Sequence, residues 1–198
     1  MSQHYYSQQP DARHDRRTIS AVLRGKDLRF TSDAGVFSKG DIDYGSRVLI
    51  EAMIIPEGSA VLDVGCGYGP IGISAALLAP KGHVTMLDIN SRAVELAREN
   101  ALHNGIRNVT VMESDVLSAL EGQQFDVILT NPPIRAGKAI VHQIFEEAYE
   151  HLKEGGTLWV VIQKKQGAPS TAAKLESLFP IVEEVGKDKG YRIMRAKK

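Results

Sequence analysis

The sequence contains one cysteine, Cys66, and no apolar run long enough to cross a membrane. A single cysteine excludes a disulfide within the chain and a multi-cysteine metal site. The longest apolar stretches, such as residues 71–79, are far shorter than the roughly 20 residues of a membrane span. The opening residues, Met1–Tyr6, lack the basic and then apolar layout of a secretory signal. We therefore expect a cytoplasmic protein with no metal site.

The sequence also lacks net charge, because 24 Lys and Arg residues balance 24 Asp and Glu residues. The charges are unevenly distributed, however. Residues 1–40 hold seven basic and four acidic residues (+3), residues 41–163 hold eight and sixteen (−8), and residues 164–198 hold nine and four (+5). If the two basic ends meet on one face, they form a phosphate-binding patch. The alternative is that both ends are simply solvated.

From residue 60 onward, short apolar runs alternate with helical patterns. Strands are expected at residues 60–64, 83–87, 108–112, 125–130 and 157–163. Helices are expected at residues 71–78, 92–103, 138–152 and 171–178. Residues 181–185 and 191–196 indicate a final antiparallel pair. This alternation predicts an α/β fold with a doubly wound parallel sheet, made mixed by the final pair.

Residues 1–198 are expected to form a single domain, a size typical of one core. Residues 55–198 would form that core, and residues 1–54 an N-terminal cap over the site. In the cap, only residues 27–31 and 45–53 have strand-like and helix-like patterns. Ser91 fits the N-cap of the second helix, and Gly155–Gly156 fits a stop after the third.

A glycine-rich turn, Gly65-Cys66-Gly67-Tyr68-Gly69, joins the first strand of the core to its helix. Ligands of doubly wound sheets bind at such turns. The spacing Gly-x-Gly-x-Gly differs from the dinucleotide fingerprint Gly-x-Gly-x-x-Gly. Asp63, just before the turn, disfavours a phosphate and suits a cationic amine such as that of S-adenosylmethionine (SAM). The alternative is an ordinary turn that needs glycine for positive φ.

Acidic residues also end the next two strands. Asp88 can accept hydrogen bonds from ribose hydroxyls, as acids at this position do in dinucleotide folds. Asp115 can accept a hydrogen bond from an adenine amino group. Alone, each acid is equally well a helix cap. Three successive acid-tipped strands after a glycine turn together predict a pocket for an adenosine with a positively charged tail.

These motifs resemble those of class I SAM-dependent methyltransferases over about residues 55–198. The resemblance implies a seven-stranded mixed sheet and SAM as the cofactor. The residues that it places around the cofactor are Asp63, Gly65, Cys66, Gly67, Gly69, Asp88, Ile89, Asp115, Val116 and Ser46.

Asn131-Pro132-Pro133-Ile134 follows the fourth strand and resembles the motif of enzymes that methylate amines or amides on planar groups. An amine conjugated to a ring is a poor nucleophile. Its hydrogens would bond to the Asn131 side-chain oxygen and the Pro132 carbonyl, which orients the nitrogen and raises its electron density. Pro133 stiffens the turn. The alternative is a plain turn that ends the strand.

The motif departs from its usual form at Ile134, where related enzymes have an aromatic residue that stacks on the acceptor. An aliphatic side chain loses stacking worth ~1–3 kcal/mol per base. Another ring, Phe37 or Tyr44, would then replace it, or affinity comes from elsewhere.

Together with Gly35–Ser38 and Asp43–Ser46, the Asn131 motif resembles the catalytic half of small-subunit ribosomal RNA guanine-N2 methyltransferases. Phe37 and Ser38 would line the site, and Asp43–Ser46 would approach the methionyl end of SAM. The alternative for these upstream residues is a surface loop and a helix cap. Larger members carry a further N-terminal domain, to which none of these 198 residues corresponds.

Four basic residues near the predicted site are candidate contacts for RNA phosphates: Arg135, Lys138, Lys164 and Lys165. The alternative is a solvated face. The sequence thus predicts a SAM-dependent N-methyltransferase acting on guanine N2 of RNA, with Asn131, Pro132 and Pro133 at the reaction centre, and Ile134 against the acceptor. The remaining alternatives are a protein glutamine or DNA adenine methyltransferase, a non-catalytic SAM- or RNA-binding module, and a nicotinamide-dependent oxidoreductase, which the glycine spacing disfavours.

Overall fold

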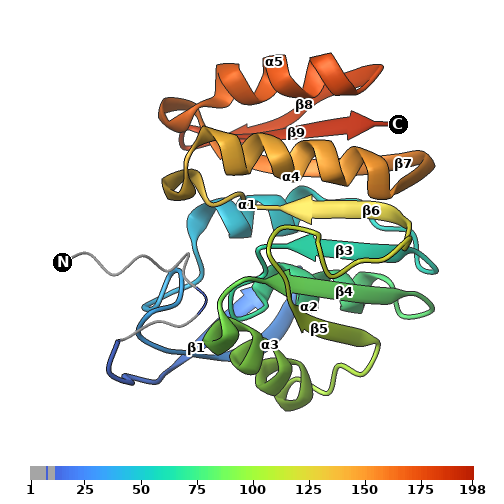
Figure 1. Ribbon diagram of the computed structural model, residues 1–198. Coiled ribbons are helices and arrows are strands. Elements are labelled where there is room, and N and C mark those ends of the chain that lie inside the picture. The colour runs from blue at the N-terminus through green and yellow to red at the C-terminus, as the bar shows by residue number, and fades with distance from the viewer. Residues whose placement is uncertain (1–7, 9–11) are drawn as a thin grey trace.

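The computed structural model describes residue 8 and residues 12–198, and its centre is a seven-stranded mixed sheet (Figure 1). The strand order is β5-β4-β3-β6-β7-β9-β8. The strands are β3 (Ala60–Val64), β4 (His83–Asp88), β5 (Val109–Glu113), β6 (Phe125–Thr130), β7 (Leu152–Gln163), β8 (Ile181–Asp188) and β9 (Tyr191–Lys197). The first five are parallel, and β9 is antiparallel to both β7 and β8. The predicted α/β fold with a seven-stranded mixed sheet is therefore confirmed.

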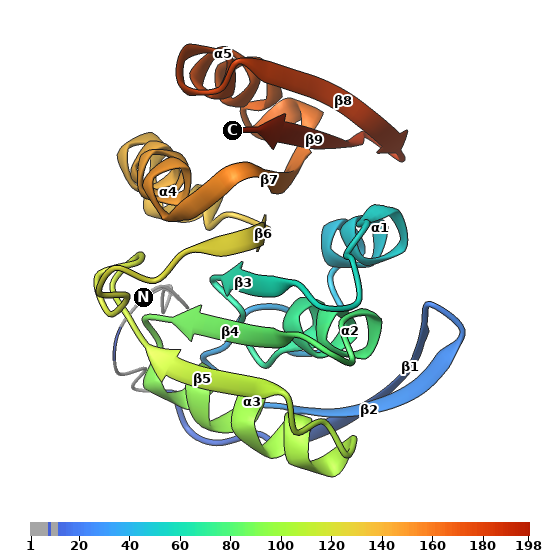
Figure 2. The same ribbon diagram turned by 90° about the vertical axis from the view of Figure 1, so that its right-hand side faces the viewer.

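Helices cover both faces of this sheet (Figure 2). One face holds α1 (Tyr44–Ala52), α2 (Pro70–Leu78) and α3 (Ser91–His103), and the other holds α4 (Lys138–His151) and α5 (Ala168–Leu178). Side chains alternate across the strands, so in β3 Val61 joins the first core and Leu62 the second. Two short 3-10 helices, η1 (Ile134–Ala136) and η2 (Lys164–Gln166), follow β6 and β7. No helix in the described part of the chain is long and apolar enough to cross a membrane.

A hairpin of β1 (Arg17–Leu23) and β2 (Lys26–Ser32) precedes the core and packs on α3. Asn100 of α3 bonds to both backbone groups of Thr31, at 2.7 and 2.9 Å. The sequence analysis found β2 but missed β1, although Ile19, Ala21 and Leu23 alternate with exposed residues in the pattern of a half-buried strand.

Two local predictions were wrong. The N-cap of α3 is Asn90 and not Ser91, because the Asn90 side-chain oxygen accepts the backbone N–H groups of Arg92 and Ala93. The expected stop at Gly155–Gly156 lies inside β7, which already begins at Leu152. Both glycines stay paired there, through backbone hydrogen bonds with Lys198.

Candidate active site

A cavity of about 750 Å³ lies at the edge of the sheet where the parallel strands end. Its wall is formed by the loops after β3, β4, β5, β6 and β7, by residues 36–38 of the N-terminal segment, and by the start of β9. This is the edge where doubly wound sheets bind ligands, and the volume suits a nucleoside-sized ligand.

The glycine turn is fixed against the end of β4. The backbone N–H groups of Gly65 and Cys66 both donate to the Leu87 carbonyl at 2.8 Å. Gly67 donates its N–H to the Asp88 carboxylate, also at 2.8 Å. Gly65 and Gly67 line the cavity with φ of 74° and 56°, a region that side chains disfavour. The turn therefore presents bare backbone to the cavity.

Asp88, the last residue of β4, lines the cavity. Its carboxylate accepts the N–H groups of Gly67 and Asn90, at 2.8 and 2.9 Å. Burial raises the pKa of this carboxyl to about 6, although those bonds favour the charged form. The group is therefore mostly ionised at neutral pH. It can still accept hydrogen bonds from ligand hydroxyls.

Asp63 does not line the cavity, because the alternation of β3 turns it toward α2. It is fully buried, and neither carboxylate oxygen has a hydrogen-bond partner in the described structure. Burial raises its pKa to about 7, although the nearby backbone N–H of Gly72 favours the charged form. A buried carboxyl without a partner, directly behind the glycine turn, fits a ligand that carries a positive charge.

Other predicted cofactor residues divide into two groups. Ile89 and Val116 line the cavity. Asp115 is exposed and does not line it, whereas the preceding residue, Ser114, does. The cavity wall does not include Cys66 or Gly69, which lie within the turn and at the start of α2. Burial raises the pKa of the Cys66 thiol, so it stays protonated.

Asn131 is held by two side chains from the N-terminal segment. Its amide nitrogen donates to the Asp43 carboxylate at 2.8 Å and to the Ser46 hydroxyl at 3.0 Å. Because both amide hydrogens are used, the amide oxygen is the end left for another donor. Asp43 also caps α1 by accepting the Ser46 N–H. Asp43 therefore lines the cavity and Ser46 lies outside its wall, and both side chains contact Asn131.

The two prolines after Asn131 are buried in the cavity wall, and Ile134 begins η1 beside them. The described residues make no recorded hydrogen bond to the Pro132 carbonyl, whereas the Pro133 carbonyl accepts the Ala136 N–H. Arg135 also lines the cavity, and Lys138 lies outside its wall; both side chains are exposed.

Two of the rings in the cavity wall belong to Phe37 and Tyr191. Tyr44 is not part of the wall; its hydroxyl donates to Asp188 at 2.5 Å. The sequence analysis missed Tyr191 as a site residue. The signal was present, because the first residue of an antiparallel strand lies at the edge where parallel strands end.

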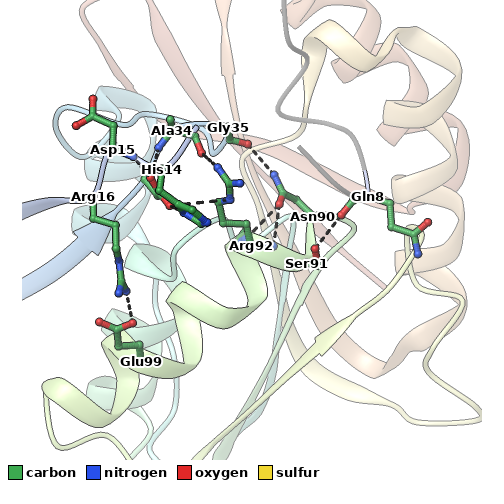
Figure 3. Close-up of polar contacts among 12 residues, drawn as sticks. Gln8, His14, Asp15, Arg16, Ala34, Gly35, Asn90, Ser91, Arg92 and Glu99 are labelled. Carbon is green, nitrogen blue, oxygen red and sulfur yellow. Dashed lines mark hydrogen bonds and ion pairs between the residues drawn. The ribbon is translucent and has the colours of Figure 1, made fainter. Parts of the chain in front are cut away.

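The N-terminal segment is tied to the loop after β4 by polar contacts (Figure 3). Asn90 donates its amide to the Gly35 carbonyl at 2.8 Å, and Arg92 donates to the Ala34 carbonyl at 2.6 Å. Ser91 donates its N–H to the Gln8 carbonyl at 3.1 Å. These contacts hold the segment next to Phe37 and Ser38 against the loop after β4, and both residues line the cavity.

Comparison with known proteins agrees with this geometry. The family model of the methyltransferase small domain matches residues 27–195. The chain is 56% identical over 200 residues to the uncharacterized protein YbxB of Bacillus subtilis, with both chains fully covered. It is 36% identical over 179 residues to ribosomal RNA large subunit methyltransferase G of Pseudomonas putida, covering 86% of this chain and 46% of that one.

The solved 16S rRNA N2 methyltransferase RsmC of T. thermophilus, in complex with AdoMet and guanosine, superimposes with a TM-score of 0.82 at 27% identity. The match covers 92% of this chain and 50% of that one, so the chain spans about half the length of these ribosomal RNA methyltransferases. The match to the family model, which extends over most of the sequence, is decisive. The chain therefore belongs to the methyltransferase small domain family of class I SAM-dependent methyltransferases.

Proposed function

We propose that this protein methylates the N2 amino group of a guanine in ribosomal RNA. The observation that carries the proposal is the locked amide of Asn131, whose hydrogens are taken by Asp43 and Ser46. Its oxygen and the Pro132 carbonyl then provide two hydrogen-bond acceptors that are adjacent in the chain. They lie at the end of the cavity near β6 and β7, called the acceptor side because it would hold the amine that receives the methyl group; the end near β3, β4 and β5 is called the cofactor side. Two acceptors match the two hydrogens of an exocyclic amine.

The cofactor side fits SAM, which when bound supplies a methyl group already activated by a sulfonium. The backbone of Gly65 and Gly67 would lie against the methionyl part, and the Asp88 carboxylate would accept the ribose hydroxyls. Ile89 and Val116 would hold the adenine, and Ser114 supplies a polar group beside them. Buried Asp63 lies behind the turn with a pKa raised to about 7, and a cationic cofactor nearby would favour its ionised form.

The chain's own residues then have mainly a positioning role. A conjugated amine is a weak nucleophile, and hydrogen bonds to two fixed acceptors align its nitrogen and increase its electron density. The nitrogen becomes acidic only as the new N–C bond forms. A strong general base is therefore not needed, and the released proton can pass to solvent.

An RNA substrate is supported by the names of the relatives and by basic side chains that follow β6 and β7, two of the strands whose ends line the cavity. Arg135, Lys138, Lys164 and Lys165 are all exposed, and none has a recorded ion pair within the described residues. Such side chains are suited to phosphates. A base within a duplex cannot reach Asn131, so the target nucleotide must be unpaired or flipped out.

The test uses tritiated SAM with unmodified ribosomal RNA, DNA and a protein extract, separated after incubation. We expect label in RNA, located on guanine N2 by nucleoside analysis. Asn131→Ala should lower kcat by roughly 100-fold or more, the size of effect that follows removal of one preorganised hydrogen-bonding group from an active site. The affinity of the variant for SAM, measured by calorimetry, should stay unchanged.

Asn108→Ala is the matched control, because the Asn108 amide bonds only to backbone carbonyls near the opposite edge of the sheet. It should retain full kcat. Label confined to protein or DNA would contradict the RNA assignment. Equal labelling by the wild type and Asn131→Ala would contradict the proposed role of the amide.

A further inference from the structure

Tyr191 is the first residue of β9 and lines the cavity on its acceptor side. In the antiparallel pair it lies opposite Gln163, the last residue of β7. The strand order places β7 and β9 on the far side of β6 from the cofactor strands β3, β4 and β5. Phe37, in contrast, belongs to the segment tied to the loop after β4. Of these two rings, Tyr191 is therefore the one separated from the cofactor strands by β6 and its Asn131 loop.

The Tyr191 ring is held from one side. Its Cδ1 and Cε1 edge lies so close to Gly45 that a Cβ at that position would come within 2.8 Å. The Tyr44 ring packs against it at 5.8 Å with an angle of 51°. Tyr44 is itself fixed by its hydroxyl bond to Asp188 and by the Lys189 ammonium, 4.9 Å above its ring. Contacts within the protein thus fix the orientation of the Tyr191 ring before any ligand binds.

The Tyr191 hydroxyl has no recorded hydrogen bond to another described residue, and the side chain is only half-buried. A buried tyrosine hydroxyl usually has a protein partner, whereas a half-buried one can bond to solvent. Here the ring itself is the supported feature, and it faces the cavity. Burial and the nearby charge of Asp43 raise the pKa of this phenol, so the ring stays neutral.

The turn after β6 has an aliphatic residue, Ile134, next to the two prolines. With an aliphatic residue at this position, the planar ring that carries the acceptor amine lacks one aromatic contact, and it needs another flat surface to pack against. We propose that Tyr191 is that surface, a specificity-determining residue whose ring packs against the planar ring that carries the acceptor amine. This inference depends on the proposed function only in taking the acceptor as a planar amine.

The test compares Tyr191→Leu and Tyr191→Phe. Leucine keeps apolar packing against the core edge but removes the ring, and phenylalanine keeps the ring. We expect Tyr191→Leu to raise KM for the RNA substrate roughly 5- to 150-fold, the range spanned by base stacking on an aromatic residue. Tyr191→Phe should stay within about threefold of the wild type. The SAM dissociation constant should be the same in all three proteins.

Tyr149→Leu is the matched control, because this ring packs on Phe179 and Lys198 away from the cavity. It should leave KM for RNA unchanged. An equal KM for Tyr191→Leu and the wild type would overturn the inference. So would a SAM affinity that falls in parallel with RNA affinity, because the ring would then serve the cofactor side or the fold.

A second measurement separates this inference from the proposed function. Guanosine binding is titrated by calorimetry in the presence of S-adenosylhomocysteine, without turnover. Weaker binding to Tyr191→Leu, with Tyr191→Phe like the wild type, supports the ring contact even if no RNA is labelled. Label in RNA together with guanosine binding that is unaffected by Tyr191→Leu supports the proposed function and rejects the ring contact.

Discussion

The glycine turn on the cofactor side of the cavity is held by the adjacent loop after β4, whereas Asn131 on the acceptor side is held by side chains from a distant part of the chain. Asp88 joins Gly67 to Asn90 through their backbone N–H groups. On the other side, Asn131 depends on Asp43, 88 positions earlier, and the nearby ring comes from Tyr191. The acceptor side can therefore change its residues while the cofactor side stays intact, which suits a fold that serves different acceptors.

The largest effect is expected from Asp88→Ala, which should damage the cofactor side alone. It removes the carboxylate that fixes the glycine turn, and hydrogen bonds to charged groups contribute ~1.5–3 kcal/mol each. We expect SAM to bind about 100-fold more weakly by calorimetry. Asp126→Ala is the control, because Asp126 accepts the Ala60 N–H at the opposite end of the strands. Comparable loss of SAM affinity in both variants would mean that the effect is general destabilisation.

The double variant Lys164→Ala/Lys165→Ala should affect the acceptor side alone. Two lost phosphate contacts should raise KM for RNA about tenfold and lower the slope of log affinity against log salt by about 1.4. SAM affinity should not change. Lys26→Ala/Lys197→Ala, which removes two exposed lysines elsewhere, should preserve the slope. If the salt slope of Lys164→Ala/Lys165→Ala equals that of the wild type, these two lysines do not contact the RNA.

Asp43→Asn tests the link between Asn131 and the N-terminal segment. Asparagine still caps α1, but a neutral acceptor binds the Asn131 amide less strongly than a carboxylate does. We expect kcat to fall about fivefold with little change in SAM affinity. Asp41→Asn removes a nearby exposed charge that pairs with Arg47, and should retain kcat. A drop in SAM affinity instead of kcat would place Asp43 on the cofactor side.

The last prediction concerns stability and not activity: buried Asp63 should make the free energy of unfolding depend on pH. Its pKa is about 7 in the folded state and 3.8 ordinarily, so the folded protein retains a proton that the unfolded chain releases. The free energy of unfolding should therefore fall as pH rises from about 4 to 7. Asp88, with a raised pKa of about 6, contributes in the same direction.

Asp63→Asn should flatten this decline, with Tm changing by roughly 2–4 °C for each kcal/mol. Thermal melts between pH 4.5 and 8 measure it. Asp115→Asn, at an exposed acid, should keep the slope of the wild type. An unchanged slope in Asp63→Asn would show that this carboxyl is already ionised in the folded protein.

The sequence predicted the cofactor side better than the acceptor side for a physical reason. Strand ends and glycine turns are local patterns, so Gly65, Gly67 and Asp88 could be placed at the cavity in advance. It is harder to predict from the sequence which face of the sheet a strand side chain occupies. Asp63 was expected at the cavity, but it points toward α2 because side chains alternate along β3. Pairs such as Asp43 and Asn131 have no local signature.

Strand β9 follows β8 in the sequence but lies between β7 and β8 in the sheet. During synthesis, the strands that carry the cofactor side are complete at Glu113, whereas Tyr191 emerges 78 residues later (191 − 113). Domains generally fold as units. Because β9 must insert between β7 and β8, a growing chain cannot complete its acceptor side until nearly all of its residues have been made.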